Sequence, residues 1–408
     1  MNIQLQKASI KQKSAVTITG SKSESNRLLL LQALFPTIGI QNISNADDAI
    51  LMQKALSSDA DIIDIHHAGT AMRFLTAFLA TQSEREVVLT GSSRMQERPI
   101  KVLVDALNQL NANITYEKTE GFPPLRIKGN IITKHKVSIK ANVSSQYISA
   151  LLLIAPSLKN GLELTLEGEI TSIPYIKMTL SLLNKLGIET KFEGQTISVK
   201  PESKGVSPIT LTVESDWSSA SYFYSISALS TIGTEITLSS YKQNSLQGDS
   251  VLADIYKEFG VSTTFISGSI RLKKEQENKN PKTFNLVNCP DIAQTIAVTC
   301  LGFGINCQLN GLHTLKIKET DRLVALKTEI EKFGTSVVIT DDSLSLNNVQ
   351  VLKNNIVVET YKDHRMAMAF APLGLKTNLA IKNADVVSKS YPDFWQDLVQ
   401  IGFTLKEN

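Results

Sequence analysis

The stretch CQLNGLHTLKIKETDRLVALKTEIEKFG, residues 307–334, joins an alternating strand, a polar loop and an amphipathic helix that closes on Phe-Gly. Leu323, Leu326, Ile330 and Phe333 follow the spacing of one helical face, so the helix is expected to bury a single apolar stripe. A short alternating strand likewise buries one of its two faces. The stretch therefore predicts an α/β unit in which the helix packs on one side of a sheet.

The same order of elements recurs along the chain with a period of roughly 70 residues, longer than that of most solenoid repeats. Clear copies begin at Glu86, Leu162 and Thr234, and weaker copies begin at Ile38 and Leu379. Six such units predict an α/β fold with two domains of three units each, divided near residues 211–219. Chance similarity among α/β segments is the alternative that the pattern alone leaves open.

Composition narrows the function classes. The chain has 408 residues, 42% of them hydrophobic, and a formal net charge of +3, which gives no support to wholesale binding of nucleic acid or membranes. No stretch approaches the roughly 18–20 apolar residues that a membrane span needs, and the N-terminus lacks the apolar run of a signal peptide. The three cysteines lack metal-site spacing, so we expect a reducing, cytoplasmic location and no metal.

Arginine is scarce and its placement is unusual. Lysine and arginine total 42, of which nine are arginine, and five of these nine stand at or just before an apolar helical run. These five are Arg27, Arg73, Arg98, Arg322 and Arg365. The dipole of a helix disfavours a cation at its N-terminus, whereas an anion bound there is favoured and a guanidinium can grip it with two hydrogen bonds. For any one arginine a surface salt bridge is the simpler explanation, but five together indicate anion binding.

Serine, lysine and glycine residues at other expected helix starts extend this pattern. They occur in GSKSESNR (residues 20–27), AGTAMRF (68–74), NVSSQYISALLL (142–153) and ITSIPYIKM (170–178). Gly69 would let a ligand approach the backbone closely, and Asp363, before His364 and Arg365, is placed as an N-cap. For any one serine, ordinary helix capping is the simpler explanation.

Two carboxylates are candidates for acid and base. Asp291 precedes an apolar helix and would alone be read as an N-cap, and Glu319, between Lys318 and Arg322, as a paired surface acid. Beside a site for two anions they become a candidate general base and general acid. Lys389 adds a cation in a polar loop.

Together these motifs resemble one family, the 5-enolpyruvylshikimate-3-phosphate synthases (3-phosphoshikimate 1-carboxyvinyltransferases). The resemblance rests on nine motifs that follow the family's order over essentially the whole chain: GSKSESNR, AGTAMRF, RMQERPI, SSQYIS, SDWSSASYF, PDIA, IKETDR, DHRMAM and KSYPDFW. It implies an inside-out α/β barrel in two domains, built from six repeated βαβαββ-type units. The N-terminal domain would span residues 21–214, the C-terminal domain residues 1–20 and 215–408, and the active site would lie in the interdomain cleft.

The resemblance also implies the reaction. Shikimate 3-phosphate would receive the enolpyruvyl group of phosphoenolpyruvate on its 5-hydroxyl, with release of phosphate and without any cofactor, on the route to chorismate and the aromatic amino acids. Asp291 would accept the hydroxyl proton, and Glu319, with Lys22, would protonate the methylene carbon. By match of motif, the shikimate 3-phosphate contacts are Lys22, Ser23, Arg27, Ser144, Ser145, Gln146, Ser172, Asp291 and Lys318. The phosphoenolpyruvate contacts are Lys22, Gly69, Arg98, Gln146, Arg322, Arg365 and Lys389, with His364 in support. A monomer is expected.

The chain departs from the family pattern at three positions. His67 stands where the family usually has Asn, Phe74 where Pro is frequent, and Thr314 where an Asn often contacts the shikimate phosphate. His67 and Thr314 are therefore given no role. We expect Gly69 to keep the phosphoenolpyruvate pocket open to the inhibitor glyphosate.

Three alternatives remain. The sister enolpyruvyl transferase that acts on UDP-N-acetylglucosamine typically uses a loop cysteine in its N-terminal half, and this chain has no cysteine before Cys289. A non-catalytic phosphate-binding protein would bind the same anions without releasing phosphate. A structural repeat protein would have no reason to concentrate arginines at helix starts.

Overall fold

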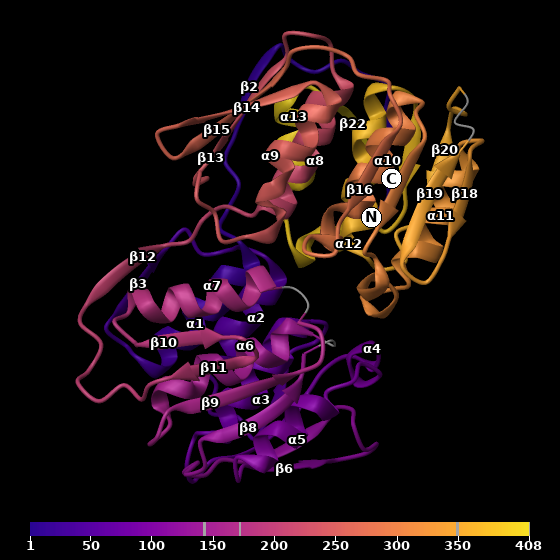
Figure 1. Ribbon diagram of the computed structural model, residues 1–408. Helices are drawn as coiled ribbons and strands as arrows, with labels where there is room; N and C mark the ends of the chain where they lie inside the picture. The colour runs from indigo at the N-terminus through magenta and orange to yellow at the C-terminus, as the bar shows by residue number, and fades with distance from the viewer. Residues whose placement is uncertain (142–143, 171–172, 348–350, 408) are drawn as a thin grey trace. The chain divides into compact units, whose positions relative to one another are not determined.

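The computed structural model describes residues 1–141, 144–170, 173–347 and 351–407 (Figure 1). The chain divides into two compact units. The N-terminal unit is Gly20–Val213, and the C-terminal unit combines Met1–Thr19 with Glu214–Asn408. The chain therefore crosses between the units twice.

One sheet topology recurs in both units. In the C-terminal unit, β16 (Lys282–Asn285) lies parallel to β17 (Cys307–Asn310), which is followed by antiparallel β19 (Ser343–Asn347) and β18 (Ser336–Ile339). The sheets β4-β5-β7-β6, β8-β9-β11-β10, β2-β13-β15-β14 and β20-β21-β1-β22 repeat this order of one parallel and two antiparallel pairings. The pair β3–β12 is a reduced sixth sheet. The predicted repeat of α/β units is thus confirmed.

The N-terminal unit contains ten strands among its described residues. They are β3 (Ile38–Gln41), β4 (Ile62–Asp64), β5 (Glu86–Thr90), β6 (Asn113–Tyr116), β7 (Leu125–Lys128), β8 (Lys136–Lys140), β9 (Leu162–Glu167), β10 (Thr190–Glu193), β11 (Thr196–Val199) and β12 (Ile209–Thr212). Its helices are α1 (Lys22–Leu34), α2 (Asp47–Leu56), α3 (Gly69–Ala80), α4 (Ser93–Gln96), α5 (Lys101–Gln109), α6 (Ser145–Ile154) and α7 (Ile173–Lys185).

In its described part, the C-terminal unit adds eight strands to the four named above. They are β1 (Ile3–Gln6), β2 (Lys13–Val16), β13 (Glu235–Ser239), β14 (Val261–Ile266), β15 (Ser269–Lys274), β20 (Ile356–Val358), β21 (Leu379–Ile381) and β22 (Thr404–Glu407). Its α-helices are α8 (Trp217–Leu229), α9 (Leu252–Ile255), α10 (Ala293–Phe303), α11 (Arg322–Lys332), α12 (His364–Phe370) and α13 (Phe394–Ile401). Short 3₁₀ turns that matter below are η2 (Gly248–Val251), η4 (Pro290–Ile292), η5 (His313–Ile317) and η7 (Ala384–Lys389).

Helices form the inside of each unit and sheets the outside. Every residue of α3 and α12 is buried, and in α8 only one residue is partly exposed. Strands such as β1 and β7 alternate buried and exposed residues, so one sheet face packs on helices and the other meets water. The predicted inside-out α/β architecture is therefore correct for each unit.

The amphipathic helices bury the predicted stripes. Leu323, Leu326, Ile330 and Phe333 are at most 1% exposed. Burying a side chain of this size stabilises the fold by about 1.5–3 kcal/mol. The periodicity of the sequence thus gave the correct face of α11.

Two of the five predicted helix-start arginines lie elsewhere. α1 begins at Lys22 and α3 at Gly69, so Arg27 and Arg73 lie in the second turns of their helices. The apolar runs after these arginines concealed the polar first turns, which are themselves helical. Arg322 and Arg365 do occupy first turns, and Arg98 precedes α5 by three residues.

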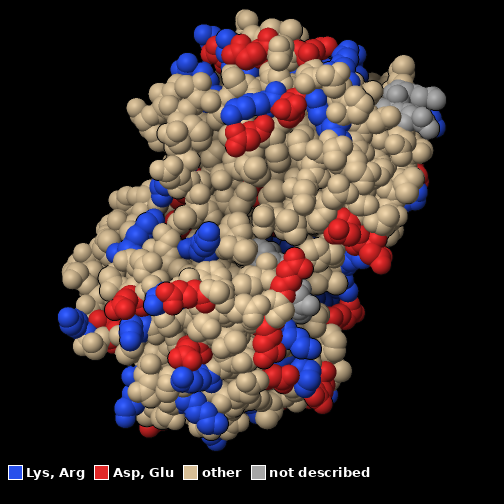
Figure 2. Space-filling view, in the orientation of Figure 1, with Lys and Arg blue, Asp and Glu red and all other residues tan. Residues whose placement is uncertain are grey.

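Charged side chains of both signs are interspersed on the face seen in Figure 2. Among the described residues, no helix is long and apolar enough to cross a membrane.

Candidate active site

The C-terminal unit gathers its charged residues around Arg322, the first residue of α11. Arg322 is only 1% exposed, and each nitrogen of its guanidinium contacts a carboxylate. Nε lies 2.6 Å from Asp363 Oδ2, Nη1 2.9 Å from Asp291 Oδ1, and Nη2 2.8 Å from Glu319 Oε2. Burial alone would lower the pKa of Arg322, but the three carboxylates outweigh it and raise that pKa. Arg322 is therefore a fixed, permanently charged centre.

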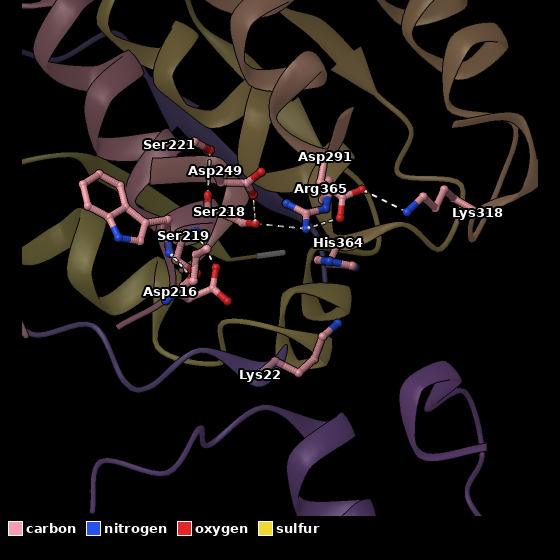
Figure 3. Close-up of polar contacts among 12 residues, drawn as sticks. Lys22, Asp216, Ser218, Ser219, Ser221, Asp249, Asp291, Lys318, His364 and Arg365 are labelled. Carbon is pink, nitrogen blue, oxygen red and sulfur yellow. Dashed lines mark hydrogen bonds and ion pairs between the residues drawn. The ribbon is translucent and has the colours of Figure 1, made fainter. Parts of the chain in front are cut away.

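Three cationic side chains contact the carboxylate of Asp291. Besides Arg322, Lys318 Nζ lies 3.3 Å from Oδ1 and Arg365 Nη2 lies 3.2 Å from Oδ2 (Figure 3). Burial would raise the pKa of Asp291, but Lys318, Arg365 and Arg322 together hold it well below its usual range. Asp291 is thus ionised in this state, as a proton acceptor must be, but it is a weak base while all three cations face it.

Local structure explains how these groups converge. Asp291 lies in η4, and α10 begins only at Ala293, so its carboxylate is free of the capping role that the sequence suggested. Asp363 does cap its helix, accepting a hydrogen bond from Arg365 N at 2.9 Å, and the same carboxylate holds Arg322. Lys389, at the end of η7, places Nζ 3.3 Å from Glu319 Oε1. We call these residues the Asp291 cluster: Asp291, Lys318, Glu319, Arg322, Asp363, Arg365 and Lys389.

The N-terminal unit holds a buried arginine of a different kind. Arg27 is 2% exposed, and its hydrogen bonds go to hydroxyl and carbonyl oxygens. These acceptors are Thr179 Oγ1, Ser149 Oγ, Ser23 O and Tyr175 O. No carboxylate in the described ranges lies within ion-pair distance of its guanidinium. Burial therefore lowers the pKa of Arg27 to about 10, while the charges of Tyr175 and Glu24 oppose this fall.

The helix starts around Arg27 carry further polar groups. Lys22, at the start of α1, lies 3.6 Å from Asp48 Oδ2. Ser144 caps α6 by accepting from Gln146 N, and Gln146 Nε2 donates to Thr70 Oγ1 of α3 at 3.3 Å. The N-terminal turns of α3 and α6 are therefore linked by a hydrogen bond.

Gly69 begins α3 against the guanidinium of Arg98. A Cβ added to Gly69 would lie 2.6 Å from Arg98 Nη1, too close for the two to keep their places. Only glycine lets this cation approach the backbone of α3 so closely.

The structure thus brings the predicted residues together in two groups. Asp291, Lys318, Glu319, Arg322, Arg365 and Lys389 meet in the C-terminal unit, and Lys22, Ser23, Arg27, Gly69, Arg98, Ser144, Ser145 and Gln146 lie on or beside α1, α3 and α6 in the N-terminal unit. His364 is buried next to the Asp291 cluster, with Nδ1 3.7 Å from Asp363 Oδ1. Ser172 lies outside the described residues.

Two carboxylates that contact predicted site residues were given no site role from the sequence. Asp363 was recognised only as a cap, and Asp48, which pairs with Lys22, was not singled out. Asp48 contacts Lys22 across 26 residues of chain, and Asp363 contacts Arg322 across 41. No local sequence pattern reveals contacts between residues so far apart in the chain. Where the family usually has Asn, His67 Nε2 lies 3.7 Å from Asp47 Oδ2. Within the described ranges, no three His, Cys, Asp or Glu side chains are grouped so as to hold a metal ion.

Sequence comparisons identify relatives over nearly the whole chain. The model of the family described as EPSP synthase (3-phosphoshikimate 1-carboxyvinyltransferase) matches residues 37–398. A 3-phosphoshikimate 1-carboxyvinyltransferase from Bacteroides fragilis is 46% identical over 97% of this chain and 96% of its own length. One from Haemophilus influenzae is 35% identical over 95% of this chain and 96% of its own length.

Solved structures share the fold. An EPSP synthase from Acinetobacter baumannii superposes with a TM-score of 0.80 at 21% identity, covering 100% of both chains. The enolpyruvyl transferase NikO from Streptomyces tendae gives a TM-score of 0.74 at 13% identity, covering 100% of this chain and 98% of its own.

Proposed function

This chain belongs to the EPSP synthase (3-phosphoshikimate 1-carboxyvinyltransferase) family, and we propose that it transfers the enolpyruvyl group of phosphoenolpyruvate to the 5-hydroxyl of shikimate 3-phosphate. The observation that carries the proposal is the contrast between buried Arg27, which forms no ion pair with a carboxylate of the described residues, and the carboxylate-rich Asp291 cluster. A reaction between two anions needs free cations to hold them and carboxylates to move protons. The chain supplies both.

Arg27 is the principal phosphate ligand for shikimate 3-phosphate. Its guanidinium is already oriented by Thr179, Ser149 and the Ser23 carbonyl, so binding orders few side chains. Lys22, Ser23, Ser144, Ser145, Gln146 and Ser172 complete the contacts to this substrate from the N-terminal unit, and Lys318 with Asp291 from the C-terminal unit.

Phosphoenolpyruvate is held by Arg322, Arg365 and Lys389 together with Lys22, Gly69, Arg98 and Gln146, and His364 supports its phosphate. Each substrate therefore takes its proposed ligands from both units. Excluding water from the reacting atoms would strengthen these charge interactions.

Asp291 takes the proton of the 5-hydroxyl as its oxygen attacks C2 of phosphoenolpyruvate. Substrate anions share Lys318, Arg322 and Arg365, which weakens the hold of these cations on Asp291 and raises its pKa toward that of an effective base. The base is thereby activated only when substrates are present.

Glu319, with Lys22, delivers the proton to the methylene carbon, giving a tetrahedral intermediate. Loss of a proton from the new methyl group and cleavage of the bond between C2 and the phosphate oxygen then yield the enol ether and inorganic phosphate. Arg322, Arg365 and Lys389 stabilise the departing charge.

The enzyme acts as a monomer in the cytoplasm. The free, buried thiols of Cys289, Cys300 and Cys307 suit a reducing compartment. Sedimentation equilibrium of the purified chain would detect a dimer, which would contradict the proposed monomer.

Phosphate release from phosphoenolpyruvate, with and without shikimate 3-phosphate, tests the activity. We expect release only with the shikimate ester. UDP-N-acetylglucosamine as the sole acceptor should give none, which separates the sister transferase. Calorimetric binding of shikimate 3-phosphate without any turnover would instead identify a non-catalytic phosphate-binding protein.

A further inference from the structure

A chain of three side chains runs from Arg365 away from Asp291. Arg365 Nη2 donates to Asp291 Oδ2 and also to Ser218 Oγ, each at 3.2 Å (Figure 3). Ser218 is the second residue of α8, and its hydroxyl in turn donates to Asp249 Oδ2 in η2. Asp249 is 3% exposed. Neither Ser218 nor Asp249 matches a residue assigned above to substrate binding or proton transfer.

The direction of these hydrogen bonds is fixed by chemistry. A guanidinium can only donate, so Ser218 must accept from Arg365. The single hydroxyl hydrogen of Ser218 is then available to Asp249 alone, and an ionised Asp249 can only accept it. The carboxylate therefore determines that a lone pair of Ser218 faces Arg365.

Keeping Asp249 ionised in the folded protein costs free energy. Its Oδ1 is buried and has no hydrogen-bond partner among the described residues. Burial first, and then the neighbouring charge of Asp291, raise the pKa of Asp249 to about 6, while Arg365 opposes this rise. The third carboxylate nearby, Asp216, which caps α8, acts in the same direction as Asp291. A neutral side chain could link η2 to α8 without this cost in folding free energy. The charge of Asp249 therefore needs a further explanation.

We propose that Ser218 and Asp249 are positioning residues for Arg365, which they hold in the orientation that receives phosphoenolpyruvate. Ser218 anchors one end of the planar guanidinium. The buried Nε of Arg365 has no hydrogen-bond partner in the described part of the chain. With Nη2 fixed by Ser218 and Asp291, rotation of the plane is restricted, and Nε–H remains as a donor for an incoming anion. This inference rests on the proposed function.

The test compares Ser218→Ala, Asp249→Ala and Asp249→Asn with the wild type in the phosphate-release assay. Ser218→Ala should raise the KM for phosphoenolpyruvate about tenfold, the usual effect of losing one hydrogen bond to a charged group. The KM for shikimate 3-phosphate should stay within about twofold, since its proposed phosphate ligand, Arg27, belongs to the other unit. Because the two residues act as one unit, Ser218→Ala/Asp249→Ala should be no worse than Ser218→Ala alone.

Ser221→Ala is the matched control. Ser221 lies one turn further along α8, is buried, and its hydroxyl bonds only neutral groups, the Ser218 carbonyl at 2.6 Å and Thr295 Oγ1 at 3.0 Å. This variant should keep the wild-type KM for phosphoenolpyruvate.

Thermal unfolding of Asp249→Asn separates positioning from a structural role. Because folding raises the pKa of Asp249 from 3.8 to about 6, its contribution favours the fold below pH 3.8 and is lost as the pH rises through 6. Asp249→Asn should therefore unfold at a higher temperature than the wild type at pH 8, with no such advantage at pH 4, and yet show a raised KM for phosphoenolpyruvate.

Two results would overturn the inference while leaving the proposed function intact. One is an active wild type together with an unchanged KM for phosphoenolpyruvate in Ser218→Ala. The other is an Asp249→Asn variant that unfolds at a lower temperature than the wild type at pH 8, which would indicate a structural tie. A wild type that releases no phosphate would overturn the proposed function, and this inference with it.

Discussion

The buried arginines of the two units differ in what compensates their charge. Arg322 in the C-terminal unit contacts three carboxylates, whereas Arg27 in the N-terminal unit contacts hydroxyl and carbonyl oxygens. Burial lowers the pKa of Arg27, but the pKa of Arg322 is raised because its carboxylates outweigh burial. In the proposed function, Arg27 is reserved for a substrate phosphate, whereas Arg322 also neutralises the protein's own carboxylates.

Among the described residues, carboxylates form ion pairs with Arg322 and not with Arg27, although Glu24 lies near enough to Arg27 to raise its pKa. A carboxylate beside Arg27 would compete with a substrate phosphate for the same donors. In the proposed function, Asp291 and Glu319 of the Asp291 cluster transfer protons, and the neighbouring cations hold the pKa of Asp291 well below its usual range. The proposal thus gives the two units different tasks, with a phosphate ligand in one and proton-transfer groups in the other.

Asp291→Asn should show the largest effect. It preserves shape and removes the proposed base, so kcat should fall about a thousandfold, within the range that general base catalysis contributes. Steady-state phosphate release measures it. Asp321→Asn is the control, because Asp321 caps α11 through its side chain and Asn caps helices equally well. An Asp291→Asn enzyme with more than a tenth of wild-type kcat would remove the assigned base.

Arg322→Met should show the next largest effect, on stability. Removing the cation leaves Asp363, which is fully buried, and its neighbours Asp291 and Glu319 without their shared partner. Breaking a buried ion pair in this way costs about 3–5 kcal/mol. Urea unfolding without ligand measures the loss, and wild-type stability would show that the carboxylates do not depend on Arg322.

Arg27→Met should act in the opposite direction. Burial lowers the pKa of Arg27 to about 10, well below its ordinary value, so its charge opposes folding at every pH below 10, and the neutral side chain should stabilise the fold by about 2 kcal/mol at pH 8. Thr179 and Ser149 remain hydrogen-bonded to each other at 3.1 Å, so the substitution leaves them satisfied. The gain should shrink as the pH rises above 10. Urea unfolding of Arg27→Met and Arg322→Met side by side measures both changes in stability. A less stable Arg27→Met would contradict the predicted gain.

Gly69→Ala should have the smallest effect, about tenfold on the KM for phosphoenolpyruvate, equivalent to about 1.4 kcal/mol. The new methyl group would displace Arg98, whose Nη1 lies 2.6 Å from the Cβ position. Inhibition by glyphosate should weaken in the same variant. An unchanged KM, or a wild-type enzyme fully active in millimolar glyphosate, would contradict the role given to Gly69.

Much of the fold was predictable because it follows from the local periodicity of apolar residues. The spacing of Leu323, Leu326, Ile330 and Phe333 gave the correct buried face, and the recurrence of that unit gave the architecture. Helix starts were less predictable, since polar residues such as Ser23 and Glu24 are helical although the apolar run begins only after Arg27.

The charge network was beyond sequence reasoning. Asp291 was predicted as a candidate base although a capping role was the simpler reading of it alone, and the 3₁₀ turn before α10 leaves its carboxylate without that capping role. Arg322 and Arg365 were singled out by their scarcity and position, and Asp291 as a candidate base, but the contacts of both arginines with Asp291 were not predicted. The contact of Arg322 with Asp363 was not predicted either, because these residues come from separate segments of the chain. Such pairing depends on tertiary placement and leaves no local pattern.

Calorimetric titration of shikimate 3-phosphate into the wild type and into Arg27→Met tests most directly whether the uncompensated charge is reserved for an anion. The wild type should bind, and Arg27→Met should bind about a hundredfold more weakly although it is at least as stable. Equal affinities in the two proteins would show that Arg27 is not the phosphate ligand and would contradict the account.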